Sequence, residues 1–157
     1  MLIEKANVID AEEILKIQKV AYLSQAEIYD DYTLHPLVET IEEAINEFEK
    51  KTIFKATINN VIVGAIRVLL KDGTCYIGKL CVDPSFQKLG IGTNLIKEVE
   101  NSFKDINRFE LFAGTMSESN ILLYEKLGYK KFKTEKYTEK ADIVYLEKYL
   151  DRGEGAV

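Results

Sequence analysis

The chain has 157 residues, a formal net charge of −5, 46% hydrophobic residues and 30% charged residues. This length and balance predict one globular domain over residues 1–150, with residues 151–157 as a flexible tail. The negative charge argues against nucleic acid as a partner, because phosphate contacts require a basic surface. No apolar run approaches the roughly 20 residues of a membrane span and no secretory leader is recognisable, so we predict a cytoplasmic protein without a membrane partner.

The two cysteines, Cys75 and Cys81, lie six residues apart in one strand-like run. If that run is extended they are separated by roughly 20 Å, which is too far for a disulfide. His35 is the single histidine, so the sequence predicts no metal site.

The N-terminal third predicts one strand and two helices, over residues 2–7, 11–23 and 41–48. Two pairs match the capping box that starts helices, namely Asp10 with Glu13 and Thr40 with Glu43. Apolar residues behind the second pair recur at helical spacing and form one stripe.

Three strand-like runs follow, over residues 52–58, 61–70 and 74–82. An Asn-Asn pair and an Asp-Gly pair separate them, and both are typical of hairpin turns, so an antiparallel meander is expected. The middle run is apolar at nearly every position, which predicts a central strand covered on both faces.

The remaining chain predicts a helix, a strand, a helix and two strands, over residues 91–103, 108–115, 119–128, 130–138 and 141–150. The complete order predicts an α/β fold: a mixed, mostly antiparallel sheet of about seven strands with helices on both faces.

A loop with two glycines, Gly90 and Gly92, joins the third strand of the meander to a helix. A helix N-terminus has unpaired N–H groups and partial positive charge, and glycine lets a phosphate approach that backbone. A diphosphate is therefore a candidate ligand, and a tight turn without a ligand is the alternative. The P-loop pattern is absent, and Leu95 stands where a dinucleotide fingerprint needs glycine, so a nucleotide-binding module is disfavoured.

The loop from Gln87 to Gly92 resembles the coenzyme A loop of the GNAT family of N-acetyltransferases, which has Gln or Arg, then Gly three residues later and Gly or Ala two after that. Asn120, Tyr124 and the run 127–129 resemble the second motif of that family, an Asn before a helix with Tyr, then Leu-Gly-Tyr. The resemblance spans residues 2–150 and implies the GNAT-like acyl-CoA N-acyltransferase fold.

The resemblance also implies the roles of particular residues. The backbone from Gln87 to Gly92, with Thr93 nearby, would hold the pyrophosphate of acetyl-CoA; these residues are Gln87, Lys88, Leu89, Gly90, Ile91, Gly92 and Thr93. The pantetheine arm would pair with the strand carrying Leu80, Cys81 and Val82, and would bond Asn120. Tyr124 would be the general acid that protonates the CoA sulfur.

The implied activity is transfer of the acetyl group of acetyl-CoA directly to a primary amine of a small molecule or peptide. A non-catalytic acyl-CoA-binding sensor on the same fold is the alternative, because the strand before the loop lacks a carboxylate that relatives use as a base. Glu110, Tyr76, an acid from residues 25–36 and a water chain stay open as the base. Cys81 is expected to be a packed strand residue and not a nucleophile.

The segment 22–39 is expected to join the first two helices in a loop that includes His35, and the resemblance places the acceptor site there. Acids and aromatic rings together suit a cationic amine, so Glu27, Tyr29 and Tyr32 are candidate contacts for a polyamine-like, amino-sugar or peptide acceptor. A solvated acidic loop is the alternative. A homodimer in which residues 143–150 pair across an interface also stays open.

Overall fold

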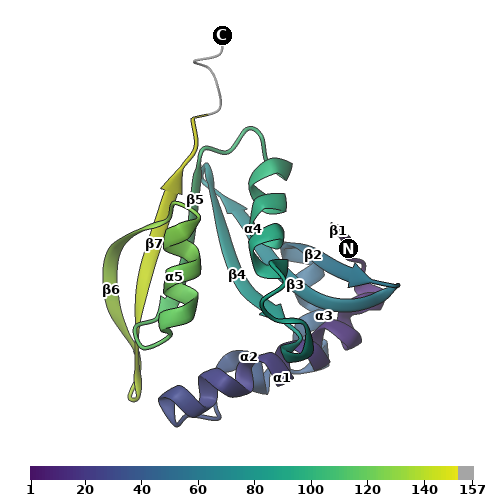
Figure 1. The fold of residues 1–157 in the computed structure, drawn as a ribbon, viewed down its shortest axis with the longest axis horizontal. Helices are drawn as coiled ribbons and strands as arrows, with labels where there is room; N and C mark the ends of the chain where they lie inside the picture. Colours follow the sequence, from purple (N-terminus) through teal and green to yellow (C-terminus); the bar gives the residue numbers. More distant parts are fainter. Residues whose placement is uncertain (152–157) are drawn as a thin grey trace.

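The computed structural model describes residues 1–151 and has the predicted succession of strands and helices, with three short helices added (Figure 1). The elements are β1 (Leu2–Lys5), η1 (Val8–Asp10), α1 (Ala11–Tyr29), α2 (His35–Val38), α3 (Ile41–Lys50), β2 (Thr52–Ile58), β3 (Val61–Lys71), β4 (Thr74–Val82), η2 (Pro84–Phe86), α4 (Ile91–Ser102), β5 (Arg108–Gly114), α5 (Glu118–Lys126), β6 (Lys130–Thr138) and β7 (Ala141–Tyr149). Of the predicted tail, residues 152–157 lie outside the described residues.

All seven strands form one sheet in the order β1-β2-β3-β4-β5-β7-β6. Every neighbouring pair is antiparallel except β4 and β5, which are parallel. These two strands pair only where Thr74–Tyr76 meet Arg108–Glu110, and beyond that point they diverge (Figure 1). The predicted mixed, mostly antiparallel sheet is confirmed, and its centre opens as a wedge.

The hairpin turns of the meander have the backbone conformation that the sequence predicts. Asn59 and Asn60 have φ of 52° and 66°, and Asp72 and Gly73 have φ of 49° and 80°. Two consecutive residues with positive φ are the requirement of the turn that matches the twist of paired strands. The meander β2–β3–β4 is therefore fixed by local sequence.

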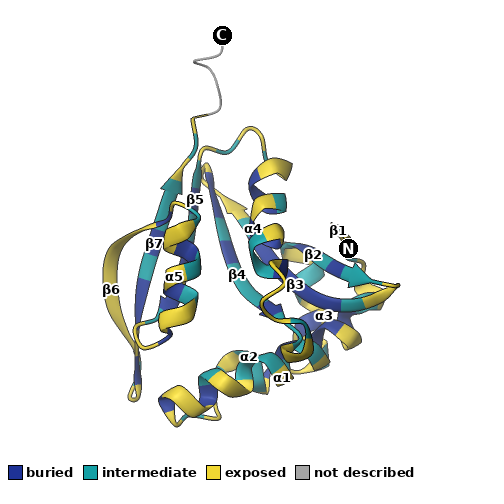
Figure 2. Cartoon of the chain, viewed as in Figure 1, coloured by how far each residue is buried: buried dark blue, intermediate teal, exposed yellow. Residues whose placement is uncertain are grey.

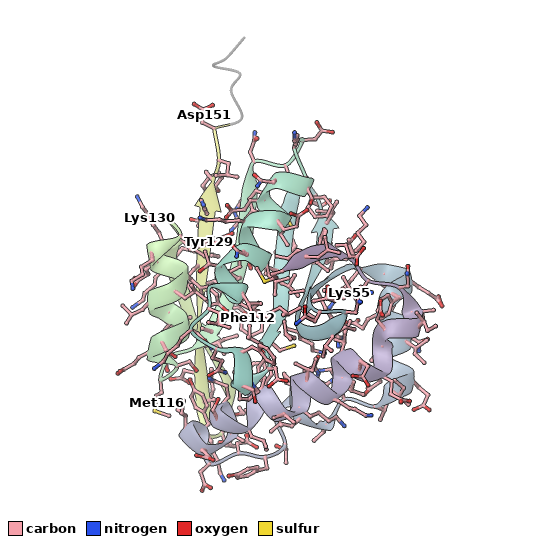
Figure 3. All side chains as sticks on the ribbon, turned by 45° about the vertical axis from the view of Figure 1, so that its right-hand side comes forward. Lys55, Phe112, Met116, Tyr129, Lys130 and Asp151 are labelled. Atoms are coloured by element: carbon pink, nitrogen blue, oxygen red, sulfur yellow. The ribbon has the colours of Figure 1, made fainter. Side chains whose placement is uncertain are left out.

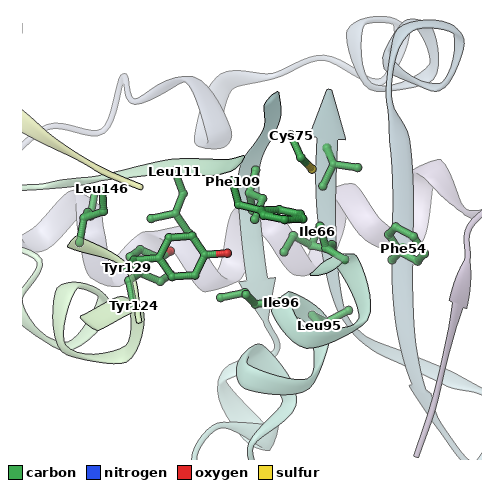
Figure 4. Packing of buried hydrophobic residues seen from close by; sticks show 14 of the residues in the cluster. Phe54, Ile66, Cys75, Leu95, Ile96, Phe109, Leu111, Tyr124, Tyr129 and Leu146 are labelled. Atoms are coloured by element: carbon green, nitrogen blue, oxygen red, sulfur yellow. The ribbon is translucent and has the colours of Figure 1, made fainter. Parts of the chain in front are cut away.

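Helices cover both faces of the sheet, and alternate strand residues point to opposite faces. On one face the apolar stripe of α4 packs in a cluster with Phe54 and Ile66, shown in Figure 4. On the other face α1 places Ile14 in a cluster with Ile53 and Ala65. Ile53 precedes Phe54 in β2, and Ala65 precedes Ile66 in β3, so each pair points to opposite faces. In contrast, β6 at the far edge of the sheet is exposed almost throughout (Figure 2).

The first helix is longer than predicted, since α1 continues past residue 23 to Tyr29. Ala26 and Tyr29 are buried and continue the stripe that begins with Ile14, and the helix ends where Asp30 takes a left-handed φ of 48°. The prediction that the chain leaves the helix after residue 23, so that residues 24–29 form part of a connecting loop, is therefore wrong. Likewise His35 does not lie in a loop but is the first residue of α2.

The two predicted capping boxes have different outcomes. At α3, Glu43 N–H donates to Thr40 Oγ1 over 3.1 Å and Thr40 N–H donates to Glu43 Oε1 over 2.9 Å, which confirms that box. At α1 the prediction is wrong, because Asp10 accepts from Asn7 N–H and from Lys55 Nζ instead of capping α1.

The C-terminal strand β7 lies between β5 and β6, and both of its edges are paired. Residues 143–149 therefore have no free strand edge with which to pair across a dimer interface. The strands at the edges of the sheet are β1 and β6.

Candidate active site

Two adjoining cavities occupy the wedge between β4 and β5. The first, which we call the cleft, has a volume of about 630 Å³ and runs along the end of β4, the glycine loop and α5. The second, the inner cavity, has a volume of about 160 Å³ and lies between α1, α2, β4 and β5. Five residues line both: Tyr22, Gln25, Leu80, Asn120 and Tyr124. The two cavities therefore meet at these residues.

The glycine loop gives the cleft an anion-binding end. Gly90 is the N-cap of α4 and has φ of 80°, a conformation that side chains rarely adopt, and a Cβ at this position would meet no atom within 4 Å. The first intrahelical bond runs from Asn94 N–H to the Gly90 carbonyl over 3.0 Å. The N–H groups of residues 91–93 therefore have no partner within the helix, and the helix dipole adds positive charge there.

Most of the predicted cofactor-binding residues line the cleft. They are Leu80, Cys81, Val82, Gln87, Lys88, Gly90, Ile91, Gly92, Thr93 and Asn120, together with the predicted acid Tyr124. Leu89 is the exception: its side chain is 63% exposed and is not part of the lining. A Cβ at Gly92 would make ordinary contacts of 3.6 Å and 3.7 Å with side chains of Leu123 and Leu80, so of the two loop glycines it is Gly90 whose backbone conformation requires glycine.

A β-bulge bends β4 where the two cavities meet. The pairing with β3 shifts between Arg67, opposite Gly78, and Ala65, opposite Cys81, and Lys79 has a left-handed φ of 47°. A bulge leaves its extra residue outside the ladder, so backbone groups near Leu80 are directed away from β3. The Tyr22 hydroxyl donates to the Leu80 carbonyl over 3.2 Å and fixes this bend from α1.

Tyr124 combines a buried ring with an accessible hydroxyl. The side chain is 7% exposed and its ring packs edge-on against Tyr129 at 6.5 Å, as Figure 4 shows. Within residues 1–151 this hydroxyl makes no hydrogen bond. Every fully buried side-chain oxygen of these residues has a hydrogen-bond partner, so the Tyr124 hydroxyl is not fully buried. The hydroxyl therefore opens onto the cavities, both of which Tyr124 lines. Burial raises the pKa of Tyr124 to about 12, so the phenol keeps its proton at neutral pH.

Tyr29 closes the inner cavity at the end of α1. Its hydroxyl accepts from Met116 N–H over 3.0 Å and lies 2.8 Å from Ser117 Oγ, which in turn bonds Gln25 Oε1. Met116 lies beside α1 in Figure 3. A Cβ at Gly114 would overlap the Tyr29 hydroxyl, so glycine is needed there. These contacts join α1 to the loop before α5 and make Tyr29 a wall of the cavity.

A buried cluster of charged side chains supports the opposite wall. Arg67 binds both oxygens of Glu39 over 2.8 Å, and also binds Gln18 and Glu47. Lys79 Nζ lies 3.2 Å from Glu39 Oε2 and lines the inner cavity. Burial alone raises the pKa of Glu39, but hydrogen bonds from Arg67 and Gln18 and the nearby cations outweigh it and hold the pKa at about 2. Burial and Arg67 lower the pKa of Lys79, while Glu39 acts in the opposite direction.

Several residues expected at the acceptor site lie elsewhere. Glu27 and Tyr32 are exposed and line neither cavity, so of the three predicted substrate contacts only Tyr29 does. The candidate bases Glu110 and Tyr76 line neither cavity, and Glu110 binds Arg108 over 2.9 Å. No acid of residues 25–36 lines them either.

Cys81 has the environment of a packing residue. It is buried, and burial raises the pKa of its thiol to about 12, so it carries no thiolate at neutral pH. Cys75 is also buried, and both cysteines are free.

The sequence did not single out several residues of the inner cavity, above all Gln25, Phe112, Ser117 and Tyr137. Phe112 lies near the centre of the molecule in Figure 3, and its exposed ring contacts Tyr137 at 6.2 Å. In β5 the exposed Phe112 lies between the buried residues Leu111 and Ala113. Successive strand residues point to opposite faces of a sheet, so this alternation was the sequence signal that Phe112 faces away from the core.

Within residues 1–151 no three His, Cys, Asp or Glu side chains are grouped to hold a metal ion. Over the same residues, no helix has both the length and the apolar character needed to cross a membrane.

Comparison with solved structures identifies proteins of the same fold. The ribosomal-protein-S18-alanine N-acetyltransferase of Escherichia coli has a TM-score of 0.80 at 16% identity, over 96% of this chain and 94% of that one. The PaiA N-acetyltransferase of Thermoplasma acidophilum, solved with coenzyme A, has a TM-score of 0.80 at 19% identity, over 96% of this chain and 100% of that one. The protein smu.2055 of Streptococcus mutans has a TM-score of 0.81 at 20% identity, over 96% of this chain and 100% of that one.

Sequence comparison gives the family. A search of curated proteins gives no significant match. The family described as acetyltransferase (GNAT) domain, however, matches residues 18–150, which is most of the chain and includes both cavities. With the glycine loop at the N-terminus of α4 and the wedge between β4 and β5, this match shows that the chain belongs to the GNAT family of acetyltransferases.

Proposed function

We propose that this protein transfers the acetyl group of acetyl-CoA directly to the primary amine of a small molecule or peptide. The observation that carries the proposal is the junction of the two cavities at Tyr124 and Leu80. The cleft suits an elongated thioester with an anionic end, and the inner cavity suits an acceptor that approaches from the other side. Tyr124 is available at the point where the two would meet.

The cleft would hold acetyl-CoA along its length. The N–H groups of residues 91–93, with Lys88, would bind the pyrophosphate, because they combine unpaired donors with positive charge. The pantetheine arm would lie along residues 80–82 of β4 in the space left where β5 diverges, and Asn120 would donate to it. The acetyl group would then lie near the bulge at Leu80.

The reaction is a single displacement at the thioester carbonyl. The neutral amine attacks the carbonyl carbon, a C–N bond forms, and the C–S bond breaks. Backbone N–H groups at the bulge would stabilise the developing oxyanion. Tyr124 would give its proton to the leaving thiolate, and because burial raises its pKa the phenol still holds that proton at neutral pH. The amine would lose its proton to water or to His35, which lines the inner cavity where no carboxylate of the described residues does.

That lack of a lining carboxylate also favours the second candidate, a non-catalytic acyl-CoA sensor. The two candidates share the cleft and differ in turnover. A sensor would bind acetyl-CoA and release no CoA with any amine, whereas the enzyme would release CoA in step with acetylated product.

The test is calorimetric titration of the purified protein with acetyl-CoA, with CoA and ATP as comparisons, followed by a CoA-release assay with amines. We expect acetyl-CoA to bind much more tightly than ATP and an amine to stimulate CoA release. Absence of acetyl-CoA binding at high concentration would overturn both candidates. Binding without release in any amine panel would leave the sensor.

A further inference from the structure

The inner cavity has a chemical character that does not suit a polycationic acceptor. Within the described residues its lining contains no Asp or Glu, and the charged side chain that lines it is Lys79. The rest of the wall is largely aromatic and aliphatic, with Tyr29, Phe112 and Tyr137 among the rings. A polyamine would bring two or more ammonium groups into this cavity, and no lining carboxylate would pair with them.

The acidic side chains at the end of α1 are directed to other partners. Asp31 accepts hydrogen bonds from Thr33 N–H and Oγ1 over 2.9 Å and 2.6 Å. Asp30 is exposed and lies 3.8 Å from Lys140 Nζ, while Glu27 is exposed on α1. Their charges therefore face solvent and the tip of the β6–β7 hairpin, and none of these acids lines the inner cavity.

The charged cluster behind β4 has more cations than anions. Arg67, Lys79 and Lys51 are joined through ion pairs to two carboxylates, those of Glu39 and Glu47. Both terminal guanidinium nitrogens of Arg67 already donate to Glu39, so Lys79 shares this carboxylate with Arg67. Lys79 is the member of the cluster that lines the cavity, and an ammonium has three N–H donors.

Lys79 lies beside the junction of the two cavities. It is next in sequence to Leu80, which lines both cavities, and Lys79 itself lines the inner cavity. An anion bound by Lys79 would therefore share the inner cavity with the attacking nitrogen. The volume of about 160 Å³ is below the roughly 300–1,000 Å³ of drug-sized sites, which favours a small acceptor.

We propose that the acceptor is a small amine with a carboxylate a few bonds from its nitrogen and an apolar or aromatic body, such as an apolar α-amino acid, and that Lys79 binds the carboxylate. This inference rests on the proposed function and names the substrate class of the same site. The rings of the inner cavity would contact the apolar body of the acceptor, and the ammonium group of Lys79 would bind its carboxylate.

The experiment compares kcat/KM for two acceptors that differ only in the carboxylate, phenylalanine and phenethylamine, with spermidine as a third acceptor. We expect phenylalanine to be the best of the three for the natural chain. Lys79→Met should reduce the phenylalanine-to-phenethylamine ratio about tenfold or more, chiefly through KM, because a charge-assisted hydrogen bond is lost. The ratio is the readout because the intrinsic basicity of the two amines cancels between variants.

Lys51→Met is the matched control, because it removes one cation from the same cluster without touching the cavity. It should keep the ratio of the natural chain, and Lys79→Arg should keep most of it. Preference for phenethylamine or spermidine, or an unchanged ratio in Lys79→Met, would overturn the inference. Acetyl-CoA binding without turnover of any of the three acceptors would overturn the substrate class, whereas absence of acetyl-CoA binding would overturn the proposed function itself.

Discussion

Replacement of Glu39 by Gln should destabilise the protein in a pH-dependent way. Glu39 is 1% exposed and binds Arg67, Gln18 and Lys79. Its pKa falls from the ordinary 4.5 to about 2, and since one pKa unit is about 1.4 kcal/mol, the ionised form contributes about 3 kcal/mol. Loss of one partner from a buried ion pair costs about 3–5 kcal/mol, so the two magnitudes agree.

The sign of the pH dependence follows from the depressed pKa. Above about pH 5 both folded and unfolded Glu39 are ionised, and the full contribution is present. Between pH 4.5 and pH 2 the unfolded carboxyl takes up a proton while the folded one does not, so the contribution is lost as the pH falls. Urea unfolding of both proteins at several pH values between 7 and 3 should therefore show a difference of about 3 kcal/mol at neutral pH that shrinks below pH 4.5.

Glu13→Gln is the control, because Glu13 is exposed and lies 3.8 Å from Lys16 on the surface of α1. Exposed pairs contribute about 1 kcal/mol or less, so this variant should stay close to the natural chain at every pH. A Glu39→Gln variant that loses less than the control, or that loses the same amount at pH 7 and pH 3, would refute the reasoning about the buried cluster.

Three further predictions concern the cleft. Tyr124→Phe should lower kcat about 100-fold or more with acetyl-CoA affinity nearly unchanged. The control Tyr129→Phe loses the 2.7 Å hydrogen bond to Glu100, so it should lower the melting temperature and keep kcat. If Tyr124→Phe has the same kcat as the natural chain, Tyr124 is not the acid of the mechanism. Gly90→Val should weaken acetyl-CoA binding in calorimetry. The control Gly73→Val changes a glycine with the same φ of 80° in the β3–β4 turn, so it should reduce stability and keep the affinity. If the two variants bind acetyl-CoA equally well, the pyrophosphate binds elsewhere. Cys81→Ala should leave turnover little changed in the CoA-release assay, and abolished turnover in a folded variant would reopen a cysteine nucleophile.

Local sequence predicts the cleft better than the inner cavity. Gly90 and the start of α4 lie within a few residues of each other, and Asn120 and Tyr124 lie one turn apart on α5, so spacing alone brings each pair together. The strand order and the hairpin turns are likewise local, apart from the insertion of β7 between β5 and β6.

The inner cavity instead depends on contacts between distant residues. Lys79 reaches Glu39 forty positions earlier, and Tyr29 meets Ser117 across 88 residues. The bulge that turns Lys79 and the fit of Tyr29 over Gly114 are properties of packing, and neither has a sequence signature. The acidic residues close to Tyr29 in the sequence suggested a cationic acceptor, but in the folded chain these acids point away from the inner cavity.

The wedge gives the sheet a mechanical weakness at its middle. Only three residue pairs hold β4 to β5, and they link a four-stranded part to a three-stranded part. A cofactor arm lying between the strands would supply backbone partners that the sheet itself lacks, so it would act as a removable eighth strand. We therefore expect occupancy of the cleft to stiffen the whole molecule, with amide exchange slowing in β4 and β5 well beyond the atoms that the cofactor touches.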